Sequence, residues 1–250
     1  MIQVNNIQKS FEDLHVLKGI TTRFEKGKTS LIIGQSGSGK TVFMKCLVGL
    51  VEPDAGNIFY DERNFTQMSF VDRRIVRKEM GKLFQGSALF DSLTVEENVI
   101  FPLEMFNKEM NKEEKRERAN FCLNRVDIKN ANHLYPAEIS GGMKKRVAIA
   151  RAIANSPKYL FCDEPNSGLD PKTAILIDNL ISEITQEFQI TTVVNTHDMN
   201  SVMEIGEHVV FLHKGDLCWE GTAEEILTTG NKEVEDFVYA SELMRKLKSI

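Results

Sequence analysis

The stretch GQSGSGKT, residues 34–41, carries the residue types that bind the phosphates of a nucleotide. It fits the pattern G-x-x-x-x-G-K-[ST] completely, follows an apolar run and opens a segment of helical periodicity. In such a loop the glycines let backbone N–H groups approach phosphate oxygens, Lys40 pairs with the β- and γ-phosphates, and Thr41 holds Mg²⁺. A dinucleotide-binding turn is disfavoured because G-x-G-x-x-G is not matched. The predicted phosphate-binding residues are Gly34, Gln35, Ser36, Gly37, Ser38, Gly39, Lys40 and Thr41.

A second apolar segment ends in two carboxylates. YLFCDE, residues 159–164, has the length and composition of a buried strand, and Asp163 and Glu164 stand at its end. A P-loop enzyme needs a carboxylate there as its second Mg²⁺ contact, which suits Asp163. Glu164 would then point toward the γ-phosphate, where it can orient or deprotonate an attacking water. The alternative is a strand end capped by solvated acids, but the complete phosphate loop favours the chemical role.

Single residues near other strands extend this site. His197 follows the apolar run TTVVNT, where a donor on the same sheet can contact the γ-phosphate, and Gln85 follows MGKLF. Phe11 lies in a strand-rich N-terminal segment and can stack on an adenine. Each has a structural alternative when taken singly, because a lone His is usually structural and such an aromatic usually belongs to the core. Their assignment therefore depends on the phosphate loop and the two acids.

A second helix start also has the character of an anion site. In ISGGMKKRVAIARA, Ser140 is a good N-cap and a Gly-Gly pair opens the helix. Lys144, Lys145 and Arg146 crowd the first turns, at the positive end of the helix dipole where acids are normally favoured. Cations there indicate a bound anion in front of the helix, or else a solvated face.

Composition narrows the class of protein. The 250 residues are 42% apolar and 27% charged, which is typical of a globular chain with a sizeable core. A net charge of −5 argues against a nucleic-acid partner. The start MIQVNNIQKS lacks the apolar stretch of a signal peptide, and no run reaches the roughly 18 apolar residues of a membrane span.

The elements that must position these residues alternate between strands and helices. Short strands are predicted over the first 33 residues, and β and α segments alternate again from residue 159, which predicts a parallel sheet covered by helices. A mostly helical block at about 86–157 is most simply an insertion into that sheet domain, and a helical extension follows at about 230–250. The whole chain, 1–250, is predicted to be one nucleotide-binding domain.

Taken in order, these motifs resemble the ATP-binding cassette (ABC) ATPases over nearly the whole chain. The series includes ISGGM at 139–143 and SGLD at 167–170 besides the motifs above. The resemblance implies an α/β P-loop NTPase with a mixed sheet core, an antiparallel β subdomain and an inserted helical subdomain. It implies ATP and Mg²⁺ as cofactors, with Thr41, Gln85 and Asp163 near the metal and Glu164 and His197 in catalysis. It adds Val16, Ser140, Gly141, Gly142 and Asp170 to the nucleotide-binding residues.

The resemblance also explains the second anion site. In this family two cassettes pair head to tail, and the signature turn of one closes over the ATP of the other, so a homodimer is expected. Met143, Ile139, Asn166 and Phe11 depart from the residues most common in the family, but none of these changes removes a catalytic group.

A finer resemblance concerns residues 83–103 and the signature helix. They look like the ATPase of the Mla (maintenance of lipid asymmetry) phospholipid transporter. This implies an integral-membrane permease, an MCE lipid-binding partner and a peripheral place on the cytoplasmic face of the cell membrane. Residues 88–103 are predicted to form part of the groove that receives a permease helix. The alternative is that Leu93, Val95, Val99 and Phe101 fill the core of the helical subdomain.

Other functions remain open from sequence. An importer ATPase for amino acids or similar solutes fits the same motifs, as does a soluble ABC ATPase of iron–sulfur assembly. Soluble members acting on ribosomes or DNA usually carry two cassettes or a long coiled coil. This chain has one phosphate loop, one signature and no long heptad array.

Overall fold

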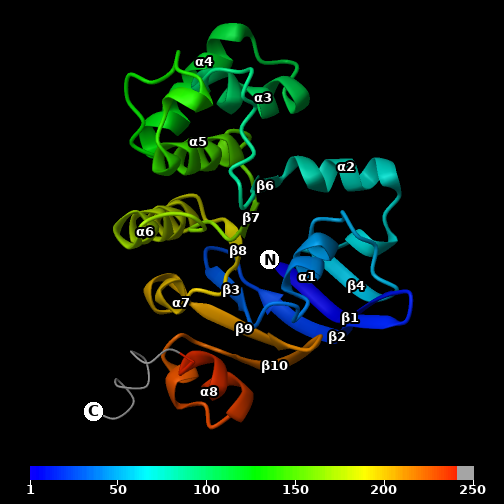
Figure 1. Cartoon of the computed structure of the whole chain (residues 1–250). Helices are drawn as coiled ribbons and strands as arrows, with labels where there is room; N and C mark the ends of the chain where they lie inside the picture. Colours follow the sequence, from blue (N-terminus) through cyan, green and yellow to red (C-terminus); the bar gives the residue numbers. More distant parts are fainter. Residues whose placement is uncertain (241–250) are drawn as a thin grey trace.

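A computed structural model describes residues 1–240 of the chain. Its centre is a six-stranded sheet in the order β10-β9-β3-β8-β7-β6, in which β9, β3, β8, β7 and β6 are parallel and β10 runs antiparallel to β9 (Figure 1). The strands are β3 (Thr29–Ile33), β6 (Met80–Leu83), β7 (Tyr159–Asp163), β8 (Thr191–Asn195), β9 (His208–His213) and β10 (Asp216–Gly221). The alternation of β and α segments read from the sequence is confirmed.

An antiparallel sheet lies beside this centre, in the order β2-β1-β4-β5. Its strands are β1 (Ile2–Phe11), β2 (Leu14–Phe24), β4 (Ala55–Tyr60) and β5 (Arg63–Asn64), followed by the short helix η1 (Phe65–Gln67) and by α2 (Phe70–Lys78). Helix α1 (Lys40–Leu47) packs between the two sheets, since Phe43 and Leu47 share one buried cluster with Ile2 and Ile58 of the antiparallel sheet and Ile32 of β3.

The other face of the central sheet is covered by further helices. Leu31 and Ile33, the neighbours of Ile32 in β3, belong to a second buried cluster, because successive residues of a strand point to opposite faces. That cluster contains residues of α5 (Gly141–Ile153), α6 (Pro171–Glu187) and α7 (Met199–Ile205). The phosphate-loop strand is therefore buried on both sides, which fixes the loop at its end.

A helical lobe occupies the segment between β6 and β7 (Figure 1). It consists of α3 (Val95–Phe106), α4 (Lys112–Arg125), η2 (Pro136–Glu138) and α5. The first two helices begin in capping boxes: Thr94 and Glu97 exchange side-chain and backbone hydrogen bonds, and Asn111 and Glu114 do the same. Such caps satisfy N–H groups that a helix start otherwise leaves unpaired.

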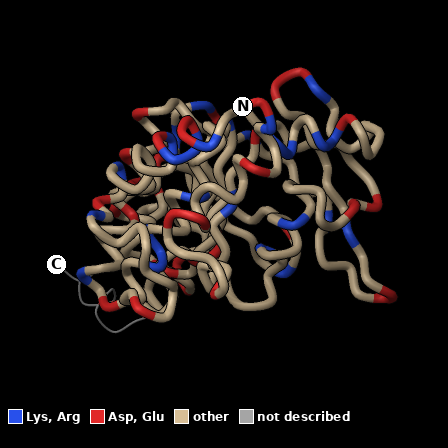
Figure 2. The backbone as a smooth tube through the Cα atoms, turned by 90° about the horizontal axis from the view of Figure 1, so that it is seen from above, with Lys and Arg blue, Asp and Glu red and all other residues tan. Residues whose placement is uncertain are grey.

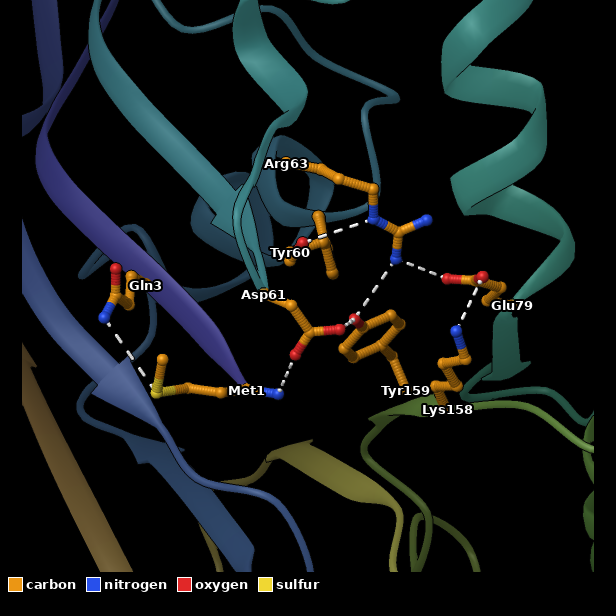
Figure 3. Close-up of polar contacts among 8 residues, drawn as sticks. All are labelled: Met1, Gln3, Tyr60, Asp61, Arg63, Glu79, Lys158 and Tyr159. Atoms are coloured by element: carbon orange, nitrogen blue, oxygen red, sulfur yellow. Dashed lines mark hydrogen bonds and ion pairs between the residues drawn. The ribbon is translucent and has the colours of Figure 1, made fainter.

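Polar contacts join the antiparallel sheet to the central one (Figure 3). The hydroxyl of Tyr159 in β7 donates a hydrogen bond to the carboxylate of Asp61 at 2.6 Å, and the N-terminal amine of Met1 donates one to the same carboxylate at 2.8 Å. Arg63 pairs with Glu79 at 2.5 Å and thereby links β5 to the residue before β6. Burial and the hydrogen bond to Asp61 raise the pKa of Tyr159, so it stays a neutral donor. These contacts tie the antiparallel sheet to the amino-terminal ends of β6 and β7, at the opposite end of these strands from Asp163 and Gln85.

The last elements of the described part are η3 (Glu225–Thr228) and α8 (Lys232–Val238), and α8 packs near β10. The predicted extension at about 230–250 therefore contains a helix, and its residues 241–250 lie outside the described part. No helix within residues 1–240 has the length and apolar character to cross a bilayer. Acidic and basic residues are interspersed along the described chain (Figure 2).

Candidate nucleotide site

Four predicted site segments meet at one edge of the central sheet. The phosphate loop follows β3, His197 follows β8, Asp163 ends β7 and Gln85 follows β6, and these strands are neighbours in the order β3-β8-β7-β6. They are parallel, so their carboxyl ends lie on the same edge. In open α/β sheets this edge is where ligands bind.

The phosphate loop has the backbone geometry that its glycines predict. Gly34 has φ +145° and Gly39 has φ +103°, values that residues with a side chain rarely adopt. A Cβ on Gly34 would meet the carbonyl oxygen of Leu212 at 2.2 Å, and one on Gly39 would meet that of Val16 at 3.0 Å. A Cβ on Gly37 would meet nothing within 4 Å, so the loop is open there. Val16 thus lies against the loop, and its assignment to the nucleotide remains a prediction.

The residues of this loop fit the phosphates of a nucleoside triphosphate. Lys40 is only 8% exposed, and its Nζ donates to the carbonyl oxygens of Gly34 and Gln35 at 2.7 and 3.0 Å. Burial lowers the pKa of Lys40, while the charges of Glu164 and Asp163 act in the opposite direction. The hydroxyl of Ser38 is buried without a hydrogen-bond partner among the described residues. A cation and an unpaired hydroxyl at an open loop are the groups that phosphate oxygens satisfy.

Asp163 is fixed by a residue that sequence reasoning did not single out. Asn195, its register partner at the end of β8, donates from Nδ2 to Asp163 Oδ1 at 2.8 Å. The signal in the sequence that could have pointed to Asn195 is an amide side chain near the end of the strand-like run TTVVNT. No group of three His, Cys, Asp or Glu within residues 1–240 is placed to hold a metal. A Mg²⁺ of the nucleotide type takes one or two carboxylates plus phosphate oxygens, so Asp163 and Thr41 fit this donor set.

The two predicted catalytic side chains contact each other. His197 Nδ1 lies 2.8 Å from Glu164 Oε1, and the His197 side chain is 71% exposed while that of Glu164 is 17% exposed. Glu164 has φ +48°, a left-handed conformation that costs a residue with a side chain on the order of 1 kcal/mol. Strain of this kind is kept where the surroundings hold a side chain in place for a task.

Gln85 and Phe11 occupy accessible positions. Gln85 Nε2 lies 3.3 Å from the hydroxyl of Ser167, so the residue after β6 touches the segment after Glu164. Phe11 ends β1 and is 47% exposed, with the Lys9 ammonium 5.3 Å from its ring centre. An exposed ring at the end of a strand is free to stack. The assignment of both residues to the nucleotide remains a prediction.

The predicted second anion site falls in the helical lobe, on a different element from the phosphate loop (Figure 1). Ser140 caps α5 by accepting from the N–H of Met143 at 3.2 Å, and a Cβ on Gly141 would meet nothing within 4 Å. Asp170 caps α6, accepting from the N–H and hydroxyl of Thr173 at 3.1 and 2.6 Å. Gly142 is close to Thr173, since a Cβ on it would lie 3.0 Å from Thr173 Cγ2. The signature turn and the SGLD segment therefore lie side by side.

Comparison with known proteins assigns this arrangement. The sequence pattern described as "ABC transporter" matches residues 17–167, which is more than half of the chain. The chain belongs to the ABC transporter family. The predicted ABC-type P-loop fold and the predicted ATPase class are thereby confirmed.

Named ABC relatives are importers. The chain is 37% identical to the methionine import ATP-binding protein MetN 2 of Bacillus cereus over 95% of its own length and 71% of that protein. It is 36% identical to the corresponding protein of Desulfitobacterium hafniense over 99% of its length and 74% of that chain. These relatives are named as methionine importers and not as Mla-type proteins, so the finer resemblance to a phospholipid transporter is not confirmed.

Solved ABC structures share the fold. The dimeric structure of MJ0796, a bacterial ABC transporter cassette, has a TM-score of 0.81 and 33% identity and covers 89% of this chain and 99% of its own. The structure of cbiO1 from Clostridium perfringens has a TM-score of 0.85 and 29% identity, covering 100% and 98%.

Two of the three cations near the start of the signature helix of this ABC protein make contacts within the chain itself. Lys145 is buried and donates to the carbonyl oxygen of Gln85, and burial lowers its pKa. Arg146 donates to the carbonyl of Asp127 at 2.9 Å, just beyond the end of α4, where unpaired carbonyls carry partial negative charge. The prediction that these side chains face an anion is therefore wrong for Lys145 and Arg146, because both donate hydrogen bonds to backbone carbonyl oxygens of the chain itself.

A groove of about 520 Å³ lies beside Gln85 between the sheet edge and the helical lobe. Val95 and Val99 are buried in the lobe, and Leu93 does not line the groove, so part of the 88–103 segment is core. The apolar lining is Met80, Phe84, Ala88, Phe90, Phe101, Pro102, Met105, Phe106 and Ala152, and Lys78, Lys82 and Arg151 also line it. No acidic residue of the described chain is among the lining residues.

Proposed function

We propose that this chain is the ATP-hydrolysing subunit of a membrane importer for an amino acid or a similar small solute. The observation that carries the proposal is the similarity to methionine import ATP-binding proteins across more than 70% of their length. Phospholipid transport with an MCE partner, the main expectation from sequence, has no support from these relatives. A soluble role in iron–sulfur assembly has none either.

The site geometry supports the following division of work. Lys40 and the loop N–H groups would hold the β- and γ-phosphates, and Thr41, Asp163 and Gln85 would hold Mg²⁺, which would neutralise charge on the phosphates. Glu164 orients or deprotonates the attacking water, and His197 holds Glu164 in place and donates to the γ-phosphate. The 2.8 Å contact between His197 and Glu164 supports this pairing.

The signature turn acts in this proposal on a second copy of the chain. Ser140, Gly141 and Gly142 stand on the helical lobe and the phosphate loop stands on α1, so the two do not share an element. MJ0796, which shares the fold, has a dimeric structure. A head-to-tail homodimer would place the Ser140 turn of one chain against the nucleotide of the other, with Asp170 beside it.

The proposed transporter also needs a permease in the membrane, and the groove beside Gln85 is its docking site. The groove is mostly aromatic and aliphatic and contains three basic residues, which suits an amphipathic permease helix. Gln85 directly follows Phe84, which lines the groove, and its side chain contacts Ser167 in the segment after Glu164, so docking would act on the nucleotide site through Gln85.

Met105→Glu is expected to reduce copurification of the permease at least tenfold without altering ATP binding. Met105 lines the groove and is 54% exposed, so the isolated subunit tolerates the change, whereas docking would bury the new carboxylate against the apolar side of a permease helix, which costs several kcal/mol. Phe121→Glu is the matched control, since Phe121 is 45% exposed on α4 of the same lobe and does not line the groove. Full copurification of folded Met105→Glu protein would remove the groove from the docking role.

Transport class is tested with the purified complex in proteoliposomes. ATP-dependent accumulation of labelled methionine or another amino acid is the expected result. Movement of labelled phospholipid without amino-acid uptake, together with a copurified lipid-binding protein, would overturn the importer proposal in favour of lipid transport.

A further inference from the structure

A buried polar cluster joins the loop that carries Glu164 to helices α6 and α7. Asp178 of α6 is 2% exposed. Asn166 Nδ2 donates to Asp178 Oδ2 at 2.7 Å and to the hydroxyl of Ser201 at 3.0 Å. Asn166 follows Glu164 by two residues, and Ser201 follows His197 by four. The cluster therefore ties α6 to the loop that carries Glu164 and to the first turn of α7, the helix that begins two residues after His197.

This cluster has fewer hydrogen-bond donors than its buried acceptor oxygens need. Asp178 Oδ1 and Asn166 Oδ1 are both buried, and neither has a hydrogen-bond partner within residues 1–240. Turning the Asn166 amide over does not help, because its oxygen would then face Asp178 Oδ2 and the existing bond would be lost. One additional proton on Asp178 removes its charge and supplies a donor to a cluster of acceptors.

The charges around Asp178 favour that proton. Burial raises the pKa of Asp178 to about 6, and the carboxylates of Asp198 and Glu204 act in the same direction. Hydrogen bonds from Ser201 and Asn166 act against it. The group that faces Asp178 from β7 is the buried thiol of Cys162, and no cation is among the groups that act on Asp178.

We propose that Asp178 is a positioning residue for the Glu164 loop, and that it works as the neutral acid, whose hydroxyl donates within the Asn166 cluster. In this form the side chains of Asp178 and Asn166 each have a donor and an acceptor to offer the other. The loop that carries Glu164 is then held through Asn166, and the turn after His197 is held through Ser201. Above the pH at which Asp178 ionises, a buried charge replaces the donor and the hold on both loops weakens.

The sign of the pH dependence follows. The folded chain binds this proton more tightly than the unfolded chain, in which an aspartate has a pKa near 3.8. The contribution to stability is therefore complete below about pH 4 and is lost as the pH rises through about 6. The raised pKa corresponds to a loss of roughly a hundredfold in the folding equilibrium constant across this window.

Asp178→Asn tests the neutral form, because an amide supplies a donor at every pH. Denaturant unfolding of the wild type and of Asp178→Asn is measured between pH 5 and 8. At pH 8 the folding equilibrium constant of the variant should be at least tenfold larger than that of the wild type, and the difference should shrink toward pH 5. Glu204→Gln is the control: it removes a neighbouring charge and leaves the titrating group, so the pH dependence should remain.

Positioning is tested by steady-state kinetics at pH 5, where wild-type Asp178 holds its proton, and this arm rests on the proposed role of Glu164. Asp178→Ala should lower kcat about tenfold with little change in KM for ATP, and Asp178→Asn should restore it. The stability arm does not depend on transport or on Glu164. A folded Asp178→Asn protein that is less stable than wild type at pH 8 would overturn the neutral-acid proposal. Equal kcat values for Asp178→Ala and wild type would overturn the positioning role.

Discussion

Glu164→Gln is expected to leave ATP binding intact and to lower ATP turnover by at least a hundredfold. A carboxylate beside the γ-phosphate can accept a proton from water and an amide cannot, and such proton transfer contributes about 10²–10⁴-fold. The change is nearly isosteric, and the amide oxygen can still accept a hydrogen bond from His197, which lies 2.8 Å from Glu164 in the wild type. Phosphate release and equilibrium ATP binding, measured on the same preparation, separate the two effects. The ATP-filled dimer should accumulate.

The matched control for this variant is Glu62→Gln, an exposed carboxylate in the turn between β4 and β5. It should keep wild-type turnover. If Glu164→Gln retained more than a tenth of wild-type turnover in the complex with its permease, Glu164 would have no role as base.

Ser140→Arg is expected to abolish hydrolysis in the homodimer while leaving ATP binding by the single chain unchanged. The side chain caps α5 in the lobe, and we propose that the turn meets the nucleotide of a second copy, where an arginine leaves no room. Mixed with Lys40→Ala chains, it forms dimers in which one site carries both defects and the other carries neither. Random pairing then restores roughly a quarter of the wild-type sites.

Loss of the cap itself must be separated from loss of the site. Ser69→Arg removes an equivalent cap, since Ser69 accepts from the N–H of Asp72 at 3.2 Å at the start of α2. Each change should cost about 1 kcal/mol of stability, but only Ser140→Arg should stop hydrolysis. If the mixture of Ser140→Arg and Lys40→Ala chains stayed as inactive as either homodimer, action across the dimer would be excluded.

Short-range patterns in this sequence were sufficient to predict the phosphate loop, the strand that ends in Asp163 and Glu164, and the alternation of strands and helices. Each depends on residues close in the chain: glycines that must adopt φ > 0, apolar runs of strand length, and a capping serine. The class of ATPase followed from the order of these motifs. The transported solute did not, because these motifs serve ATP and carry no information about a solute, and the phospholipid expectation found no support among the named relatives.

Only the tertiary structure decided what the polar side chains do once the strands are ordered. The order β3-β8-β7-β6 brings Asn195 to Asp163 and His197 to Glu164, pairs separated by more than thirty residues that local periodicity does not connect. Charge pattern alone predicted an anion in front of α5, yet folding buries Lys145 against the carbonyl of Gln85. The reason is physical: a buried donor takes the nearest acceptor that packing supplies, and packing is set by contacts between distant segments.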